Sequence, residues 1–249
     1  MPTLIESAKE FVMATLHEKL TSAHLYHNFN HTQRVVKHVK ELIEAEGIGA
    51  EDAEILELAA WFHDVGHIEG PLGHEAVSAE IAINFLKAEG ASESFIERVK
   101  ACILATKMGA TPTTGLEKLL VDADFSHFAS KNYDEIASLL REELELTGLK
   151  TYTDEEWLEE NIKMFNSHHR FFTAHAIENW QPEKNRNLVK LMKSLKKIRS
   201  KNESFQLKSE GFKLKKDKSQ TPERGIETMY RVSLRNHIDL SSIADTKAN

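Results

Sequence analysis

The amino-acid sequence predicts an all-α protein. Helix-breaking residues are scarce, since the 249 residues include only 11 Gly and 5 Pro, whereas the good helix formers Ala, Leu, Glu and Lys are abundant. Apolar residues also recur at intervals of three and four through most of residues 1–200, which is the spacing that buries one face of a helix. A chain of this length can build one sizeable core with appendages.

The composition narrows the class of protein further. A single cysteine, Cys102, rules out an internal disulfide framework and suits a reducing compartment. No apolar run approaches the roughly 18–20 residues of a membrane span, and the N-terminus lacks the basic start and apolar core of a secretory signal. We therefore expect a cytoplasmic protein. The net charge of −7 argues against nucleic acid as the main partner.

The first half of the chain carries a histidine and a His-Asp pair on helical segments. His31 stands at the start of one predicted helix, near the edge of its buried face. His63 lies four positions after Ala59 on an apolar stripe, so its side chain should point inward, and Gly66 is predicted to mark the end of this helix. The predicted helices of this half span residues 6–20, 32–46, 51–63, 74–87 and 92–103.

The second half adds two aspartates, of which one faces the interior. On a helical wheel Asp124 lies close to the direction of the buried Leu120, whereas Asp122 lies on the far side. We therefore expect Asp124 to reach an interior site. The predicted helical stretches of this half span residues 116–128, 133–146, 154–179 and 188–198.

The composition changes after residue 200. Lys, Ser, Glu and Gln dominate residues 201–222 and the helical periodicity vanishes, which is typical of a linker. Periodicity returns at Ile226 and continues toward Asn249. We therefore divide the chain into a domain over residues 1–200, a Lys-rich linker over 201–222 and the start of a helical module over 223–249.

Four side chains on separate predicted elements form a candidate metal site: His31, His63, Asp64 and Asp124. Imidazole nitrogens and carboxylate oxygens together suit a borderline divalent ion that keeps positions open for water and substrate. Adjacent residues point about 100° apart on a helix. His63 and Asp64 can therefore coordinate together only where a helix is ending.

The order His31 … His63-Asp64 … Asp124 resembles the HD superfamily of metal-dependent phosphohydrolases. The flanking sequences strengthen the resemblance, and they are Tyr26-His27-Asn28-Phe29-Asn30-His31-Thr32, His63-Asp64-Val65-Gly66 and Asp122-Ala123-Asp124. The resemblance covers roughly residues 1–200 and implies an HD-domain helical bundle with a central metal cleft. It implies that His31, His63, Asp64 and Asp124 hold the metal, and that metal-bound water attacks a phosphate ester. Asp64 could also orient or deprotonate that water.

Further residues near this motif are candidates for a second metal or for substrate contacts. Members of the superfamily with two metals place extra histidines where His67 and His74 stand, and a turn or helix-cap role is the alternative for both. Lys107, His169 and Arg170 could meet a phosphate oxygen, the alternative being a solvated face. The metal could be Mn, Mg, Fe, Ni or Zn.

The tail carries a second resemblance. Arg224-Gly225-Ile226-Glu227-Thr228-Met229-Tyr230-Arg231 and the following residues to Asn249 are similar to the opening of a membrane-anchored module in effectors of Pycsar-type antiphage signalling. In that family apolar spans follow directly after such a stretch. We therefore expect the full-length protein to continue into a membrane segment and to be anchored at the cytoplasmic face, where a Lys-rich linker suits anionic lipids.

The sequence thus predicts a divalent-metal-dependent phosphohydrolase that acts on a phosphate ester, preferably a nucleotide or cyclic nucleotide. In this interpretation His63 and Asp64 carry the catalytic centre. The alternative is a nucleotide-binding sensor that signals to a membrane module without turnover. The complete ligand set favours hydrolysis, because a binding module need not retain it. Whether the chain forms a homo-oligomer is left open.

Overall fold

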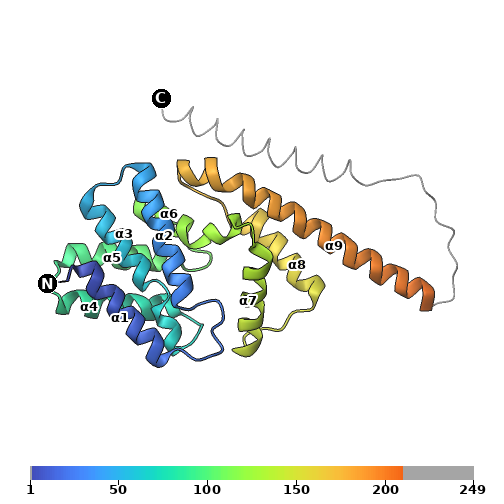
Figure 1. The fold of residues 1–249 in the computed structure, drawn as a ribbon, viewed down its shortest axis with the longest axis horizontal. Helices are drawn as coiled ribbons and strands as arrows, with labels where there is room; N and C mark the ends of the chain where they lie inside the picture. The colour runs from blue at the N-terminus through green and yellow to red at the C-terminus, as the bar shows by residue number, and fades with distance from the viewer. Residues whose placement is uncertain (1, 210–249) are drawn as a thin grey trace. The chain divides into compact units, whose positions relative to one another are not determined.

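The computed structural model describes residues 2–209, and every regular element in this part of the chain is a helix (Figure 1). This confirms the predicted all-α class. The α-helices are α1 (Leu4–Lys19), α2 (Phe29–Glu46), α3 (Ala50–Phe62), α4 (His74–Ala88), α5 (Glu93–Ala105), α6 (Gly115–Asp124), α7 (Tyr133–Leu146), α8 (Asp154–Lys163) and α9 (Gln181–Ser209). The shorter helices are η1 (Val65–Glu69), η2 (Phe125–Ala129), η3 (Met164–His168) and η4 (Ala176–Trp180).

Local sequence fixes where several helices begin. α1, α6 and α8 each start with a capping box, in which a threonine accepts the backbone N–H three residues later and a glutamate at that position accepts the threonine N–H. α2 ends at Gly47, whose φ of 66° is a left-handed conformation that favours glycine. These capping residues explain why the observed starts of α1, α6 and α8 lie within two residues of the predicted ones.

The described residues form two apolar cores. The larger core packs α1 to α6 together around residues such as Leu42, Leu58 and Phe62, all 0% exposed. The smaller one joins η2, α7, η3 and α9 through Phe128, Tyr133, Ala137, Phe165 and Leu191, and α8 packs against it. The residues up to Ser200 form one compact unit.

The chain is not helical throughout the predicted stretch 154–179. α8 continues into η3, which ends at His168, and residues 169–172 are irregular before the chain turns back into a helix. The cause is Asp122, whose carboxylate accepts the backbone N–H groups of Phe172 at 3.0 Å and Thr173 at 2.8 Å. These bonds replace the helical ones that this segment gives up.

Residues 201–209 were expected to belong to a linker without helical periodicity, but in the structure they form the end of α9, which continues to Ser209. The remainder of residues 201–222 and all of the predicted module 223–249 lie outside the described residues. Among the helices of the described part, none is long and apolar enough to cross a membrane.

Candidate metal centre

His31 is held in the first turn of α2 by the residues just before it. The side-chain oxygen of Asn28 caps the helix and accepts the backbone N–H groups of Asn30 at 3.0 Å and His31 at 3.3 Å. The ring of Tyr26 packs 4.8 Å from the His31 ring. The sequence before His31 therefore fixes both the start of the helix and the orientation of the imidazole.

His63 and Asp64 lie where α3 ends. His63 follows the last helical residue, and Asp64 has left the helical region with φ −113° and ψ 3°. The two side chains can therefore turn toward one cavity although they are adjacent in sequence. His63 Nδ1 lies 2.8 Å from the carbonyl of Ala60. A carbonyl oxygen can only accept, so Nδ1 carries a proton and donates it to Ala60, and the lone pair of Nε2 is available to a metal, as is usual for histidine ligands.

Gly66 has a role that its sequence position did not reveal. It was expected to end the helix, but α3 ends at Phe62 and Gly66 lies inside η1. Its backbone N–H donates to Ser78 Oγ at 2.8 Å, and a Cβ atom there would lie 2.1 Å from the carbonyl oxygen of His74. Only glycine allows η1 to approach α4 this closely. This contact brings His74 beside Asp64.

Asp124 is the last residue of α6 and completes the first group. His31 Nε2 lies 3.1 Å from Asp64 Oδ2 and 3.3 Å from Asp124 Oδ1. His63 Nε2 lies 3.2 Å from His31 Nε2, 3.2 Å from Asp64 Oδ2 and 3.7 Å from Asp124 Oδ1. Asp122, by contrast, is fully buried against residues 172–173 and does not line the cavity.

The distances among His31, His63 and Asp64 fit a divalent ion, and the ligand atoms of these three residues all lie within 4.8 Å of one another. Nitrogen and oxygen ligands lie about 2.0–2.2 Å from a metal such as zinc, so neighbouring ligands around one ion are roughly 3.0–3.6 Å apart. The electrostatics agree with this. Burial opposes a charged imidazole at His63, yet the Asp64 and Asp124 carboxylates raise its pKa to about 9. Burial likewise raises the pKa of Asp64, but the surrounding histidines hold it well below its usual range. The site therefore stabilises positive charge.

A second group of possible ligands shares Asp64 with the first and adds His67 and His74. The second carboxylate oxygen of Asp64, Oδ1, lies 3.4 Å from His74 Nε2. His74 Nδ1 lies 3.0 Å from the carbonyl oxygen of Pro71, as expected of a ligand that a backbone carbonyl orients. The third member, His67, is 3% exposed and neither ring nitrogen has a hydrogen-bond partner. Burial lowers its pKa to about 2, so its imidazole is neutral. Ligand atoms of Asp64, His67 and His74 all lie within 4.8 Å of one another, so the group could hold an ion.

His27 and Glu143 form a pair beside these groups that the sequence did not reveal. His27 Nδ1 lies 2.5 Å from Glu143 Oε1, and Glu143 Oε2 accepts the backbone N–H groups of Tyr26 at 2.7 Å and His27 at 2.9 Å. Burial raises the pKa of Glu143, but His27 and these N–H groups lower it to about 2. His27 stands in a flank of the motif, whereas Glu143 lies on α7 among other glutamates, where no sequence signal distinguishes it.

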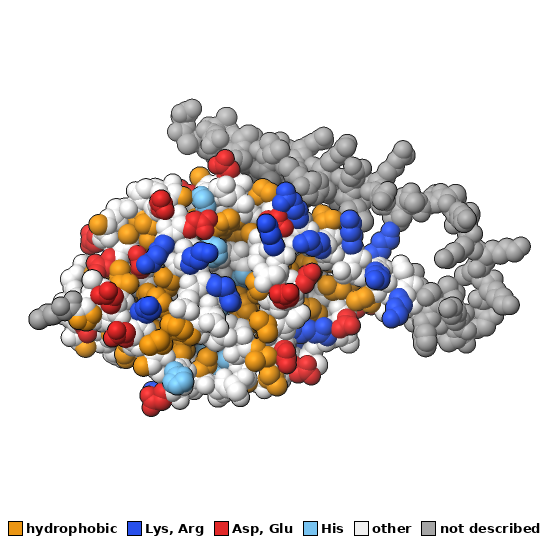
Figure 2. All heavy atoms as spheres, in the orientation of Figure 1, with side chains coloured by type: hydrophobic (Ala, Val, Ile, Leu, Met, Phe, Trp, Pro, Cys, Tyr) orange, Lys and Arg blue, Asp and Glu red, His pale blue; other side chains and the backbone are white. Residues whose placement is uncertain are grey.

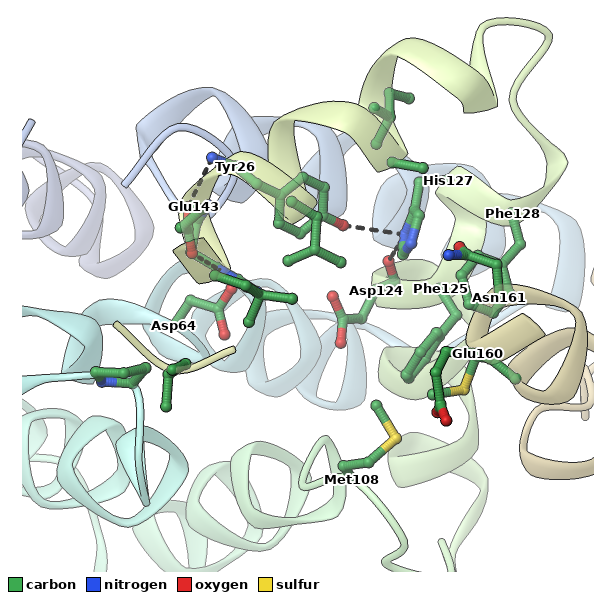
Figure 3. A pocket seen from close by; sticks show the side chains of 18 of the residues that line it. Tyr26, Asp64, Met108, Asp124, Phe125, His127, Phe128, Glu143, Glu160 and Asn161 are labelled. Carbon is green, nitrogen blue, oxygen red and sulfur yellow. Dashed lines mark hydrogen bonds and ion pairs between the residues drawn. The ribbon is translucent and has the colours of Figure 1, made fainter. Parts of the chain in front are cut away.

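The carboxylates of Asp64, Asp124 and Glu143 line one cavity of about 350 Å³, whereas His31 and His63 are buried and do not line it. In Figure 3 the carboxylates of Asp64 and Asp124 point into it, and Phe125, Met108 and Glu160 lie on the far side of Asp124. His27, His67 and His74 also line it. The cavity therefore brings the polar groups together at one end and leaves a wide apolar wall at the other.

The three remaining sequence candidates lie away from this cavity. Lys107 and Arg170 are exposed, and Arg170 lies over the ring of Phe172. His169 is buried and its Nδ1 lies 2.8 Å from Nζ of Lys184. Burial lowers the pKa of Lys184 to about 7. None of the three lines the cavity.

Comparison with known proteins agrees with this geometry. A family model described as the HD domain matches residues 28–124. The matched segment begins with the Asn28 cap of α2 and ends with Asp124, so it contains all four residues of the first group. No curated protein and no solved structure was found to match the chain.

Proposed function

Residues 28–124 form an HD domain, the domain of a superfamily of metal-dependent phosphohydrolases, and on this premise we propose that the chain hydrolyses a phosphate ester. The single observation that supports this most directly is the convergence of His31, His63, Asp64 and Asp124, in which each imidazole Nε2 lies 3.1–3.7 Å from an oxygen of both carboxylates. A scaffold protein would have no use for such a group, because burying His31, His63 and Asp64 without a cation is costly.

We propose that these four residues hold one divalent ion and that Asp64, His67 and His74 hold a second. Such ions lower the pKa of water and neutralise charge on phosphoryl oxygens. Asp64 would serve both groups, since each of its oxygens faces a different set of histidines. The hydrogen bonds of His63 and His74 to backbone carbonyls support their assignment as ligands.

His27 is the residue best placed to protonate the leaving group. Its Nδ1 is engaged by the ionised carboxylate of Glu143, so Nε2 is the ring nitrogen that can pass a proton to a substrate in the cavity. The carboxylate fixes the orientation of the ring, which is what proton transfer from a positioned side chain requires. Protonation of the departing oxygen completes the cleavage of the phosphorus–oxygen bond.

The substrate that we propose is a nucleotide or cyclic nucleotide. The support is the combination of phosphate-directed ligands with an aromatic wall that includes Phe125, Tyr152 and Trp157, because ligand pockets of this kind bind flat organic groups on aromatic side chains.

The first experiment is a metal analysis combined with a panel of linear and cyclic nucleotides. The purified protein should contain a divalent metal and release product from at least one of them. Asp64→Ala should lose both metal and activity, and retention of the metal in that variant would show the ligand assignment to be wrong. Saturable binding without product would instead favour the sensor.

The two aspartates of α6 provide a matched pair. Asp124→Asn should lose metal, because its carboxylate faces His31, whereas Asp122→Asn should retain it, because its partners are Phe172 and Thr173. Circular dichroism melts of both variants would separate loss of metal from loss of fold. Metal loss in Asp122→Asn with an intact fold would contradict the assignment.

A further inference from the structure

We infer that the cavity selects substrates with a single phosphoryl group, free or cyclic, attached to a bulky aromatic group, and that it discriminates against di- and triphosphates. This inference rests on the proposed hydrolase function and specifies its substrate class. It follows from the charge and the shape of the cavity wall beyond the ligand groups.

Among the described residues, none that lines the cavity is a lysine or an arginine. Twenty-five residues of the described part of the chain line it, and five of them are acidic, namely Asp64, Glu75, Asp124, Glu143 and Glu160. Basic side chains instead gather on the outer surface, for example along α9 (Figure 2). Proteins that bind chains of phosphates supply arginine or lysine for the phosphate oxygens. The ions at the ligand groups would compensate one phosphoryl group, but a second or third would meet neither lysine nor arginine among the described lining residues, since the nearby Lys150 lies over the ring of Tyr152.

The end of the cavity that faces away from Asp64 is apolar and aromatic. Met108 and Phe125 lie there in Figure 3, and Tyr152, Trp157 and Met164 extend the same wall. Tyr152 and Trp157 are in ring contact at 5.3 Å, so they present a preformed surface. Aromatic and methionine side chains bind flat apolar groups well. They carry no positive charge to compensate a phosphate.

Glu160 adds a repulsive element to this wall. It is exposed, lines the cavity and lies beyond Asp124 as seen from Asp64 (Figure 3). A carboxylate at that position would repel a distal phosphate. The cavity volume of about 350 Å³ is near the lower end for ligand pockets, which fits one compact molecule.

The test uses two matched series with the metal-loaded protein. AMP, ADP and ATP share a nucleoside and differ in the number of phosphates, whereas naphthyl phosphate and glycerol 3-phosphate share one phosphate and differ in the organic group. We expect kcat/KM to be at least tenfold higher for AMP than for ADP and ATP. Because naphtholate leaves more easily than an alkoxide, the two monoesters are compared by KM, which should be at least tenfold lower for naphthyl phosphate than for glycerol 3-phosphate. A preference for ATP, or equal KM values for the two monoesters, would overturn the inference.

Calorimetric titration separates this inference from the proposed function. If no ester is hydrolysed, the hydrolase proposal fails, but AMP should still bind more tightly than ATP, and naphthyl phosphate more tightly than glycerol 3-phosphate. Absence of binding by all five compounds, or tighter binding of ATP, would contradict the inferred preference for monophosphates with an aromatic group.

A charge reversal at the wall gives the sharpest variant. Glu160→Lys should narrow the difference between AMP and ATP by at least fivefold, since it replaces a repulsive carboxylate with a cation. Glu145→Lys is the matched control, because Glu145 is exposed on α7 and does not line the cavity. An equal effect of both variants would show that net charge, and not the cavity wall, controls the preference.

Discussion

His27 Nδ1 lies 2.5 Å from Glu143 Oε1, although 116 residues separate the two in the sequence. The bond joins the loop before α2 to α7, and Glu143 also accepts two backbone N–H groups of that loop. One carboxylate thus positions the loop and orients the imidazole. His27 is therefore held beside the metal ligands in one orientation, which is the condition for efficient proton transfer.

Replacement of His27 should reveal this role through the leaving group. His27→Ala should lower kcat by about 100- to 10,000-fold for an ester with an alkyl leaving group, because that alkoxide must be protonated as it departs. The loss should be much smaller for p-nitrophenyl esters, whose leaving group is stable as an anion. Steady-state kinetics with both esters measures the difference, and His17→Ala, at an exposed position of α1, is the control.

A variant of Glu143 tests the same pair from its other side. Glu143→Gln keeps an oxygen for the backbone N–H groups but weakens the bond that orients the His27 ring, so it should show the same leaving-group dependence with a smaller loss. Equal losses for both esters in the His27 and Glu143 variants would mean that the pair is only structural.

Replacement of His74 should remove one of two ions. His74 Nε2 faces Asp64 Oδ1, whereas the other oxygen of Asp64 faces His31 and His63. We expect elemental analysis to find two divalent ions per chain in the wild type and one in His74→Ala, since the first group of ligands is unchanged. A single ion in the wild type, with no change in the variant, would limit the centre to His31, His63, Asp64 and Asp124.

The sequence could predict the fold class and the inward faces of individual helices, because both depend on local spacing. His31, His63 and Asp124 all lie on faces that periodicity identifies as buried. The helical wheel placed Asp122 away from the buried face, which is wrong, because the structure buries it completely against Phe172 and Thr173. Asp124 is the aspartate that lies beside His31. His31, His63 and Asp124 needed only the helix period to be recognised.

The remaining parts of the site depend on contacts between distant segments. Glu143 resembles its neighbours on α7 until the loop at Tyr26 packs against it. The irregular segment at residues 169–172 exists because Asp122, some 50 residues earlier, accepts its N–H groups. Gly66 was interpreted as a helix terminator, whereas its function is a close contact with α4. Neither periodicity nor propensity contains such information.

The close contact at Gly66 predicts a strong effect of a single methyl group. In Gly66→Ala the new Cβ would meet the His74 carbonyl oxygen at 2.1 Å and the Ser78 backbone nitrogen at 2.7 Å. Backbone atoms cannot yield cheaply, so the free energy of unfolding should fall by about 2–3 kcal/mol. Urea titration measures this.

Gly115→Ala is the matched control for this change. Gly115 is the first residue of α6 and a Cβ there meets nothing within 4 Å, so stability should be unchanged or slightly increased. The metal content of Gly66→Ala should also fall, because the same contact brings His74 beside Asp64. A fully stable Gly66→Ala protein would show that η1 and α4 can separate without cost.

Lys184 should make the stability of the protein depend on pH above neutrality. Its side chain is 3% exposed and its Nζ donates to the carbonyl of His169 at 2.8 Å, close to the rings of Phe128 and Phe165. Burial lowers the pKa of this amine from 10.5 to about 7. Between these two values the unfolded chain binds the proton and the folded chain does not, so the free energy of unfolding should rise with pH, by about 2 kcal/mol from pH 7 to 9. Below pH 7 the amine is protonated in both the folded and the unfolded state, so Lys184 no longer makes the free energy of unfolding depend on pH.

Lys184→Met isolates this contribution, because methionine fills a similar volume among aromatic rings and does not titrate. The difference in unfolding free energy between pH 7 and pH 9, measured by urea titration, should be smaller by about 2 kcal/mol in Lys184→Met than in the wild type. Lys193→Met, at an exposed position of α9, should leave the difference unchanged. Comparing differences removes the contributions of other groups, such as Cys102, whose pKa burial raises to about 12. If Lys184→Met keeps the full pH dependence, the amine is protonated in the folded protein and its charge is stabilised by the carbonyl of His169 and the surrounding rings.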